Sequence, residues 1–320
     1  MPYTNEQLVK LLTPNILIEL ITGSTSYGLN NGNSDVDKKA VANLPKRHFF
    51  TLGKDFETIA LHQPNDYEIH SLRKFITLLM KQNPTITEML WTEERFITKT
   101  SKYGDALRDN REMFLCSEAY YAFGGYARDQ LMRIKGGLEK LTEDDKIEHL
   151  NHTAQGMIDS FPRKYSEAGN GILLLNEVST LSNGKQNLQL NVQYDNISLT
   201  QLNGMLSELH HTTQTYNKMG KRNRKPGEKL FKHAMHLLRL LISGIELLET
   251  GVLTVYREKE RELLLKVRNE EFTWDEIFEM VAYYQERLKQ AYEKTYLPPT
   301  VDTDKAEEFY QDLMLEWFAA

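Results

Sequence analysis

The chain has 320 residues, enough for one large domain or two ordinary ones, and its 40% apolar and 26% charged residues exclude disordered, collagen-like and coiled-coil proteins. No uncharged apolar stretch approaches the roughly 18 residues of a membrane span, and the N-terminus lacks a signal-peptide pattern. The single cysteine, Cys116, permits no internal disulfide. We therefore expect a protein of the reducing cytoplasm. The 39 basic and 45 acidic side chains give a net charge of −6, which argues against wholesale coating of nucleic acid.

The first part of the chain predicts a small mixed sheet. Thr4 is placed to cap a short helix. Extended segments are then expected at residues 16–21, 36–44, 57–61 and 67–72, with a glycine turn at Gly23.

Helical patterns follow. Apolar residues recur at helical spacing from Leu72 to Met80, so Ser71 is expected to cap a helix that ends at Asn83-Pro84, before a second helix over 87–94. From about residue 105 the pattern is helical nearly throughout, with its clearest apolar stripe running from Ala234 to Leu248 and stopping at Gly251.

The exception is an Asn-, Gln- and Ser-rich stretch over 169–198, which predicts a loop or hairpin insertion. We therefore predict an α+β protein. A small mixed-sheet module is expected over 1–104 and a mainly α-helical domain over 105–320, with an irregular insertion at about 169–198.

Two acidic residues stand close together after the first predicted strand. Asp35 and Asp37 are two positions apart, so in an extended segment their carboxylates project from the same face and predict a site for a hard cation. Mg²⁺ prefers such oxygen ligands and keeps positions for substrate phosphates. The Gly23-Ser24 turn could bring backbone N–H groups and a hydroxyl close to a phosphate. A metal site beside a turn that can bind phosphate indicates phosphoryl or nucleotidyl transfer.

A third carboxylate is expected from a neighbouring strand. Asp66 and Glu68 are both candidates and share one face. In a two-metal arrangement such an acid orients or deprotonates the attacking hydroxyl. For Glu68, a surface carboxylate beside the ligands is an equal alternative.

A Gly-Ser pair followed eleven positions later by Asp-x-Asp resembles the signature of the DNA polymerase beta-like nucleotidyltransferases, and most closely the branch associated with RNA repair. The resemblance covers about the first hundred residues and a block near 230–280. It rests on these segments: 23–28, 34–39, 66–75, 83–90, 125–127, 232–241 and 246–251. The chain departs from the branch at Ala40, where glycine is usual, and in the 169–198 insertion.

The resemblance implies that Asp35 and Asp37 bind Mg²⁺ or Mn²⁺, that Ser24 contacts the triphosphate of an NTP, and that Asp66 is preferred to Glu68 as the third acid. We therefore predict Asp35, Asp37 and Asp66 as catalytic residues and the same three with Glu68 as metal ligands. The nucleotide-binding residues that we predict are Gly23, Ser24, Tyr27, Ser34, Lys39, Lys232, His233 and Arg239.

Positive charge gathers in one stretch, 218–239, which predicts contact with an RNA backbone. A mobile basic loop before a helix is the equal alternative. His233 and His236 lack further ligands at zinc-like spacing, so a structural or phosphate-contacting role is favoured over a metal pair.

The sequence thus predicts a nucleotidyltransferase that moves a nucleoside monophosphate from an NTP to an RNA or tRNA 3′ end. A protein or small-molecule hydroxyl is the alternative acceptor, and a non-catalytic nucleotide-binding protein is the alternative outside the enzyme class.

Overall fold

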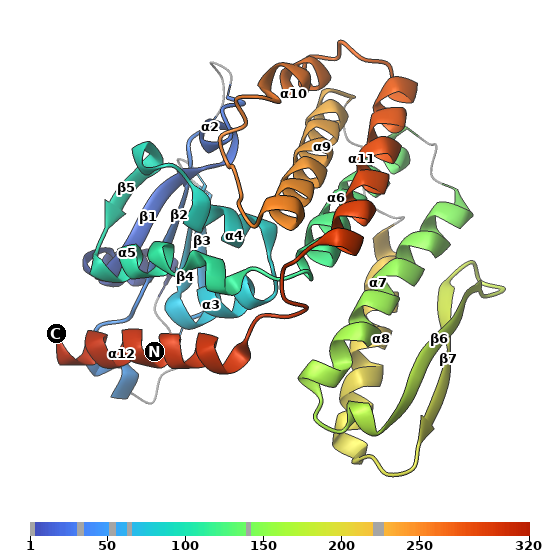
Figure 1. Cartoon of the computed structure of the whole chain (residues 1–320), viewed down its shortest axis with the longest axis horizontal. Coiled ribbons are helices and arrows are strands. Elements are labelled where there is room, and N and C mark those ends of the chain that lie inside the picture. The colour runs from blue at the N-terminus through green and yellow to red at the C-terminus, as the bar shows by residue number, and fades with distance from the viewer. Residues whose placement is uncertain (1–3, 31–34, 51–55, 63–65, 139–141, 220–226) are drawn as a thin grey trace. The chain divides into compact units, whose positions relative to one another are not determined.

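A computed structural model describes residues 4–30, 35–50, 56–62, 66–138, 142–219 and 227–320 (Figure 1). Contacts divide the chain into two units: unit 1 comprises Met1–Ala127 and Met235–Ala320, and unit 2 comprises Arg128–Ala234. This division differs from the boundary expected at residue 104, because helices from the C-terminal part of the chain pack with the N-terminal module. The division by function at 104 stays a prediction.

A five-stranded sheet forms the centre of the N-terminal module, in the strand order β3-β4-β2-β1-β5. Its strands are β1 (Ile16–Thr22), β2 (Asp37–Ala42), β3 (Thr58–Leu61), β4 (Tyr67–Ser71) and β5 (Ile97–Thr100). The β2–β4 pair is parallel and the other pairs are antiparallel. The mixed sheet followed by a mainly helical region confirms the predicted α+β class.

Side-chain caps fix the starts of the first helices. Thr4 forms a capping box at α1 (Asn5–Leu12), and Ser71 Oγ accepts from Lys74 N at the start of α3 (Leu72–Met80). Asn83 both follows α3 and caps α4 (Pro84–Trp91), whose proline occupies the first turn. The second predicted helix therefore exists but begins and ends three residues earlier than expected.

Both faces of the sheet are covered. On one face, Ile18, Leu20 and Val41 pack with buried residues of α3, α4, α5 (Lys102–Asp109) and α12 (Thr303–Ala319). On the other face, Ala40, Ala42 and Ile69 form a smaller core with Leu12 and Phe56. Burial of apolar area on both faces holds the strand ends at fixed positions.

Unit 1 also contains the short helix α10 (Arg261–Arg268) and the long helix α11 (Trp274–Lys294). The long helices α6 (Ala119–Gly137) and α9 (Gly227–Thr250) have residues in both units. Short 3-10 segments occur at 13–15, 46–50, 94–96, 111–114 and 168–170. The predicted apolar stripe of α9 is buried from Ala234 to Leu248, and Gly251 follows the helix with φ +65°. The stripe and its stop are confirmed.

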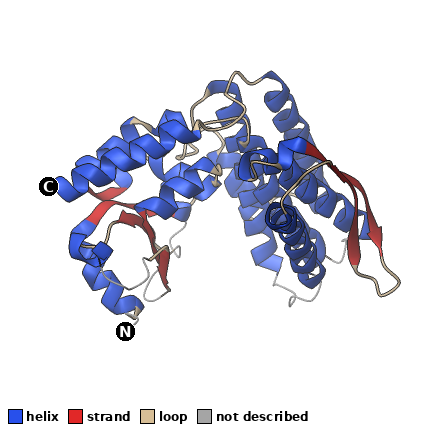
Figure 2. Ribbon diagram, turned by 90° about the horizontal axis from the view of Figure 1, so that it is seen from below, coloured by secondary structure: helices blue, strands red, loops and turns tan. Residues whose placement is uncertain are grey.

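Unit 2 contains α7 (Glu143–Lys164), α8 (Leu199–Met219) and a hairpin of β6 (Gly171–Thr180) and β7 (Gln186–Tyr194) (Figure 2). Leu173 of the hairpin packs with Met205 and Leu209 of α8. The expected insertion at 169–198 therefore contains an antiparallel hairpin, the second of the two forms expected for it, with one register shift between Leu175 and Glu177. Within the described residues, no helix has the length and apolar character that crossing a membrane requires.

Candidate active site

The Gly23-Ser24 turn lies at the end of β1 and opens the short helix α2 (Gly23–Ser26). Gly23 has φ +69°, a conformation that glycine adopts at little cost. A Cβ at Gly23 would lie 2.3 Å from Asp37 Oδ2. Asp37 begins β2 and pairs with Thr22, the last residue of β1. The turn and the Asp37 carboxylate are therefore in direct contact.

Asp66 stands at the start of the neighbouring strand. The N–H of Lys38 donates to the Asp66 carbonyl at 2.9 Å, and the parallel pairing of Lys38 with Tyr67 continues through β4. Asp66 directly precedes β4, and the register of Lys38 with Tyr67 puts it level with Asp37. The Asp66 carboxylate is 67% exposed and lies 2.9 Å from His62 Nδ1. The structure thus brings Asp37 and Asp66 to adjacent strand starts.

Glu68 lies on the same face of the sheet as Asp37, but its carboxylate is already paired with a lysine side chain. Its carboxylate forms an ion pair with Lys39, and its Oε2 lies 3.7 Å from Nε2 of buried His70. Burial lowers the pKa of His70 to about 4, although the Glu68 charge acts in the opposite direction. Lys39 and Glu68 neutralise each other, which agrees better with a supporting role for Glu68 than with a free metal ligand.

Asp35, the first acid of the Asp-x-Asp motif, was expected to lie on one strand face with Asp37, and the structure places it outside the strand. Asp35 is exposed and precedes β2, which begins only at Asp37. Ser34 lies outside the described residues. Among the described residues, no group of three His, Cys, Asp or Glu side chains is arranged to hold a metal ion.

Tyr27 and Arg239, both predicted to bind nucleotide, contact each other in the interior of unit 1. The Arg239 guanidinium carbon lies 3.8 Å from the centroid of the Tyr27 ring. Glu88 of α4 joins both side chains: Tyr27 donates to Glu88 Oε2 at 2.7 Å, and Arg239 Nη1 is ion-paired with Glu88 Oε1. Glu88 was part of the motif resemblance but was not predicted as a site residue. A glutamate within the apolar segment of α4 was the signal that it required a partner.

The segment after α9 holds the loop that follows the turn. Three successive carbonyls accept from arginine donors: Tyr27 from Arg257 N at 3.1 Å, Gly28 from Arg261 Nε at 2.8 Å, and Leu29 from Arg268 Nη1. Sequence reasoning missed these arginines, because they follow the turn by more than two hundred residues.

The other two predicted nucleotide contacts on α9 belong to unit 2. Lys232 is exposed, and His233 Nδ1 lies 2.6 Å from Gln130 Oε1. Residues 220–226 of the basic stretch lie outside the described residues.

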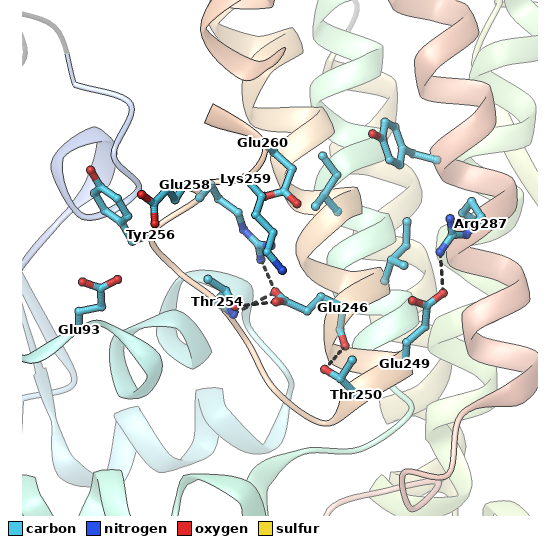
Figure 3. Close-up of a pocket in the computed structure, with 14 residues that line it drawn as sticks. Glu93, Glu246, Glu249, Thr250, Thr254, Tyr256, Glu258, Lys259, Glu260 and Arg287 are labelled. Carbon is cyan, nitrogen blue, oxygen red and sulfur yellow. Dashed lines mark hydrogen bonds and ion pairs between the residues drawn. The ribbon is translucent and has the colours of Figure 1, made fainter. Parts of the chain in front are cut away.

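One pocket of about 500 Å³ lies among residues of α9, α11 and the segment between α9 and α10 (Figure 3). Glu246 points to Thr254, whose Oγ1 lies 2.6 Å from Glu246 Oε1, and Glu249 pairs with Arg287 at 2.8 Å. None of the predicted site residues lines it. Tyr256, which does line it, has its ring close enough to Gly28 to leave no space for a Cβ there.

Comparison with known proteins finds one family that part of the chain matches. Residues 4–152 match the family described as the RNA repair pathway DNA polymerase beta family, which confirms the resemblance drawn from the motifs within that range. That range contains the five-stranded sheet, the Gly23-Ser24 turn and the predicted acids. No curated protein and no solved structure matches the chain.

Proposed function

Because residues 4–152 match the RNA repair pathway DNA polymerase beta family, we propose that the protein is a divalent-metal-dependent nucleotidyltransferase whose acceptor is an RNA or tRNA 3′ end. The contact between the Asp37 carboxylate and the Gly23-Ser24 turn carries the proposal. It puts an acidic ligand beside a turn whose backbone can approach a phosphate.

The reaction that we propose is a single displacement at the α-phosphorus of an NTP. The acceptor hydroxyl oxygen forms a bond to that phosphorus, the bond to the pyrophosphate oxygen breaks, and pyrophosphate leaves. Asp66 receives the hydroxyl proton. Its carboxylate is exposed, and it can therefore return the proton to water. The Gly23-Ser24 turn orients the triphosphate.

The donor set suits a hard cation. Asp37 and Asp66 offer only carboxylate oxygens, and Mg²⁺ is commonly held by one or two carboxylates together with substrate phosphates. Asp37 and Asp66 would hold the ion, with Asp35 as an exposed third carboxylate. Such an ion neutralises the charge that develops on the phosphates.

The test is incorporation of labelled nucleotide. The purified chain is incubated with each α-labelled NTP, Mg²⁺ or Mn²⁺, and three acceptors: RNA with a free 3′ hydroxyl, the same RNA with a blocked 3′ end, and a protein mixture. The proposal expects label only on the free 3′ end. Label on protein would refute the RNA acceptor, and no label with any acceptor would refute the proposed activity.

A further inference from the structure

Three polar side chains meet in the buried interior of unit 1. Tyr27 is 7% exposed, Glu88 is 4% exposed and Arg239 is 5% exposed. Glu88 accepts from the Tyr27 hydroxyl through one carboxylate oxygen and pairs with Arg239 through the other. Arg239 also stacks on the Tyr27 ring. We call these three residues the Tyr27–Glu88–Arg239 cluster.

Each member of the cluster depends on the others electrostatically. A buried charge is costly unless it is paired, so Arg239 and Glu88 require each other. Burial, the largest single influence, acts to lower the pKa of Arg239, but the Glu88 charge, the neighbouring Tyr27 and the hydrogen bond to Glu88 together outweigh it and leave that pKa raised. Burial also raises the pKa of Tyr27, so its hydroxyl remains a proton donor to Glu88.

The cluster is joined directly to the turn that carries the proposed function. Tyr27 is the C-terminal cap of α2, and its N–H donates to the Gly23 carbonyl at 3.2 Å. Its own carbonyl accepts from Arg257 N. The side chain of Tyr27 is thus held by α4 and α9, while its backbone is held by the turn and by the segment after α9.

We propose that Glu88 is a positioning residue, which fixes the Gly23-Ser24 turn for the NTP triphosphate by holding Tyr27 and Arg239. This inference rests on the proposed nucleotidyltransferase function and deepens it. Because the three side chains are buried and paired with one another, we assign them to support of the turn, in place of the direct nucleotide contact expected for Tyr27 and Arg239. They set where the backbone of the turn lies, and the cluster therefore governs the KM for NTP more than kcat.

The test uses Tyr27→Phe, which removes one hydroxyl but keeps the ring under Arg239. The matched control is Tyr103→Phe, which removes a hydroxyl from a 6% exposed tyrosine whose partner is the Glu316 carbonyl. Without this bond the turn is less ordered in the free enzyme, and NTP must order it on binding. A hydrogen bond to a charged group is worth about a factor of ten or more, so Tyr27→Phe is expected to raise the KM for NTP, by up to about tenfold. It should leave kcat within about twofold. Tyr103→Phe should leave both unchanged.

Hydrogen exchange of the amides of residues 23–29, measured without substrate, separates this inference from the proposed function. Tyr27→Phe and Glu88→Gln should speed exchange there and leave the β6–β7 hairpin unchanged. If wild-type protein transfers no nucleotide but the two variants still exchange faster in residues 23–29, the proposed function is refuted and the positioning of the turn by the cluster is supported. Unchanged exchange in residues 23–29, or an unchanged KM in an active enzyme, would overturn the positioning role.

Discussion

The carboxylate of Asp37 lies against the α-carbon of Gly23, so closely that a Cβ on Gly23 would fall 2.3 Å from Asp37 Oδ2. Two features of the structure require glycine at this position. Its backbone has φ +69°, and its missing side chain leaves the space that Asp37 occupies. The pairing of Thr22 with Asp37 across β1 and β2 produces the contact, because it aligns the end of one strand with the start of the next.

Gly23→Ala should therefore abolish most nucleotide transfer. The left-handed conformation costs an alanine about 1–2 kcal/mol, and the new methyl group must displace Asp37. We expect activity to fall more than tenfold while circular dichroism stays native. Gly169→Ala, where a Cβ meets nothing within 4 Å, is the control and should be fully active. Equal activity of the two variants would contradict the contact.

Burial of His70 predicts an acid-sensitive fold. The folded-state pKa of His70 is about 4, against an ordinary value of 6.5, so the unfolded chain binds more protons between these values. Stability should be full above pH 6.5 and fall as the pH decreases toward 4, by at most about 1.4 kcal/mol for each pH unit. Thermal unfolding of His70→Gln at pH 7 and pH 5 should show a smaller loss than wild type; an equal loss would argue against the shift.

Lys229 and Lys232 are exposed on α9 and offer a test of the predicted RNA contact. If both contact phosphates of single-stranded RNA, the double variant Lys229→Glu, Lys232→Glu should reduce the slope of log affinity against log salt by about 1.4. Filter binding across a salt series measures this slope. Lys289→Glu, an exposed lysine of α11, is the control. A slope that is the same in all three proteins would locate RNA binding elsewhere.

Removal of divalent ions should stop the reaction without unfolding the protein. Mg²⁺ bound by two carboxylates and substrate phosphates contributes to substrate binding more than to the fold. Dialysis against EDTA should abolish transfer, and added Mg²⁺ or Mn²⁺ should restore it, with the midpoint of thermal unfolding unchanged. Transfer that persists in EDTA would refute the metal requirement.

Local signals in the sequence predicted the parts of the fold that depend on neighbouring residues. The caps at Thr4 and Ser71, the strands around Asp37 and Tyr67, and the stop at Gly251 all follow from residues within a few positions of each other. The same signals identified Gly23 and Asp37, because strand, turn and strand are consecutive.

Contacts between distant segments could not be predicted in this way. Arg239 and Glu88 are separated by 151 positions, and no pattern within α4 or α9 indicates which buried charge pairs with which. Arg261 and Arg268 reach the Gly28–Leu29 backbone across a still longer separation. Asp35 was expected in β2 because alternation assumes a strand, but the strand pairing with Thr22 begins at Asp37.

The most direct test of the account is nucleotide transfer by Asp37→Asn, which keeps the shape of the side chain and removes its charge. Asp109→Asn, an exposed residue at the end of α5, is the matched control. Labelled NTP, Mg²⁺ and RNA with a free 3′ hydroxyl are supplied to each variant and to wild type. Because a metal ion supplies several kcal/mol of transition-state stabilisation, Asp37→Asn should lose about a hundredfold or more of the activity, and Asp109→Asn should lose none. Incorporation at the wild-type rate by folded Asp37→Asn would contradict it.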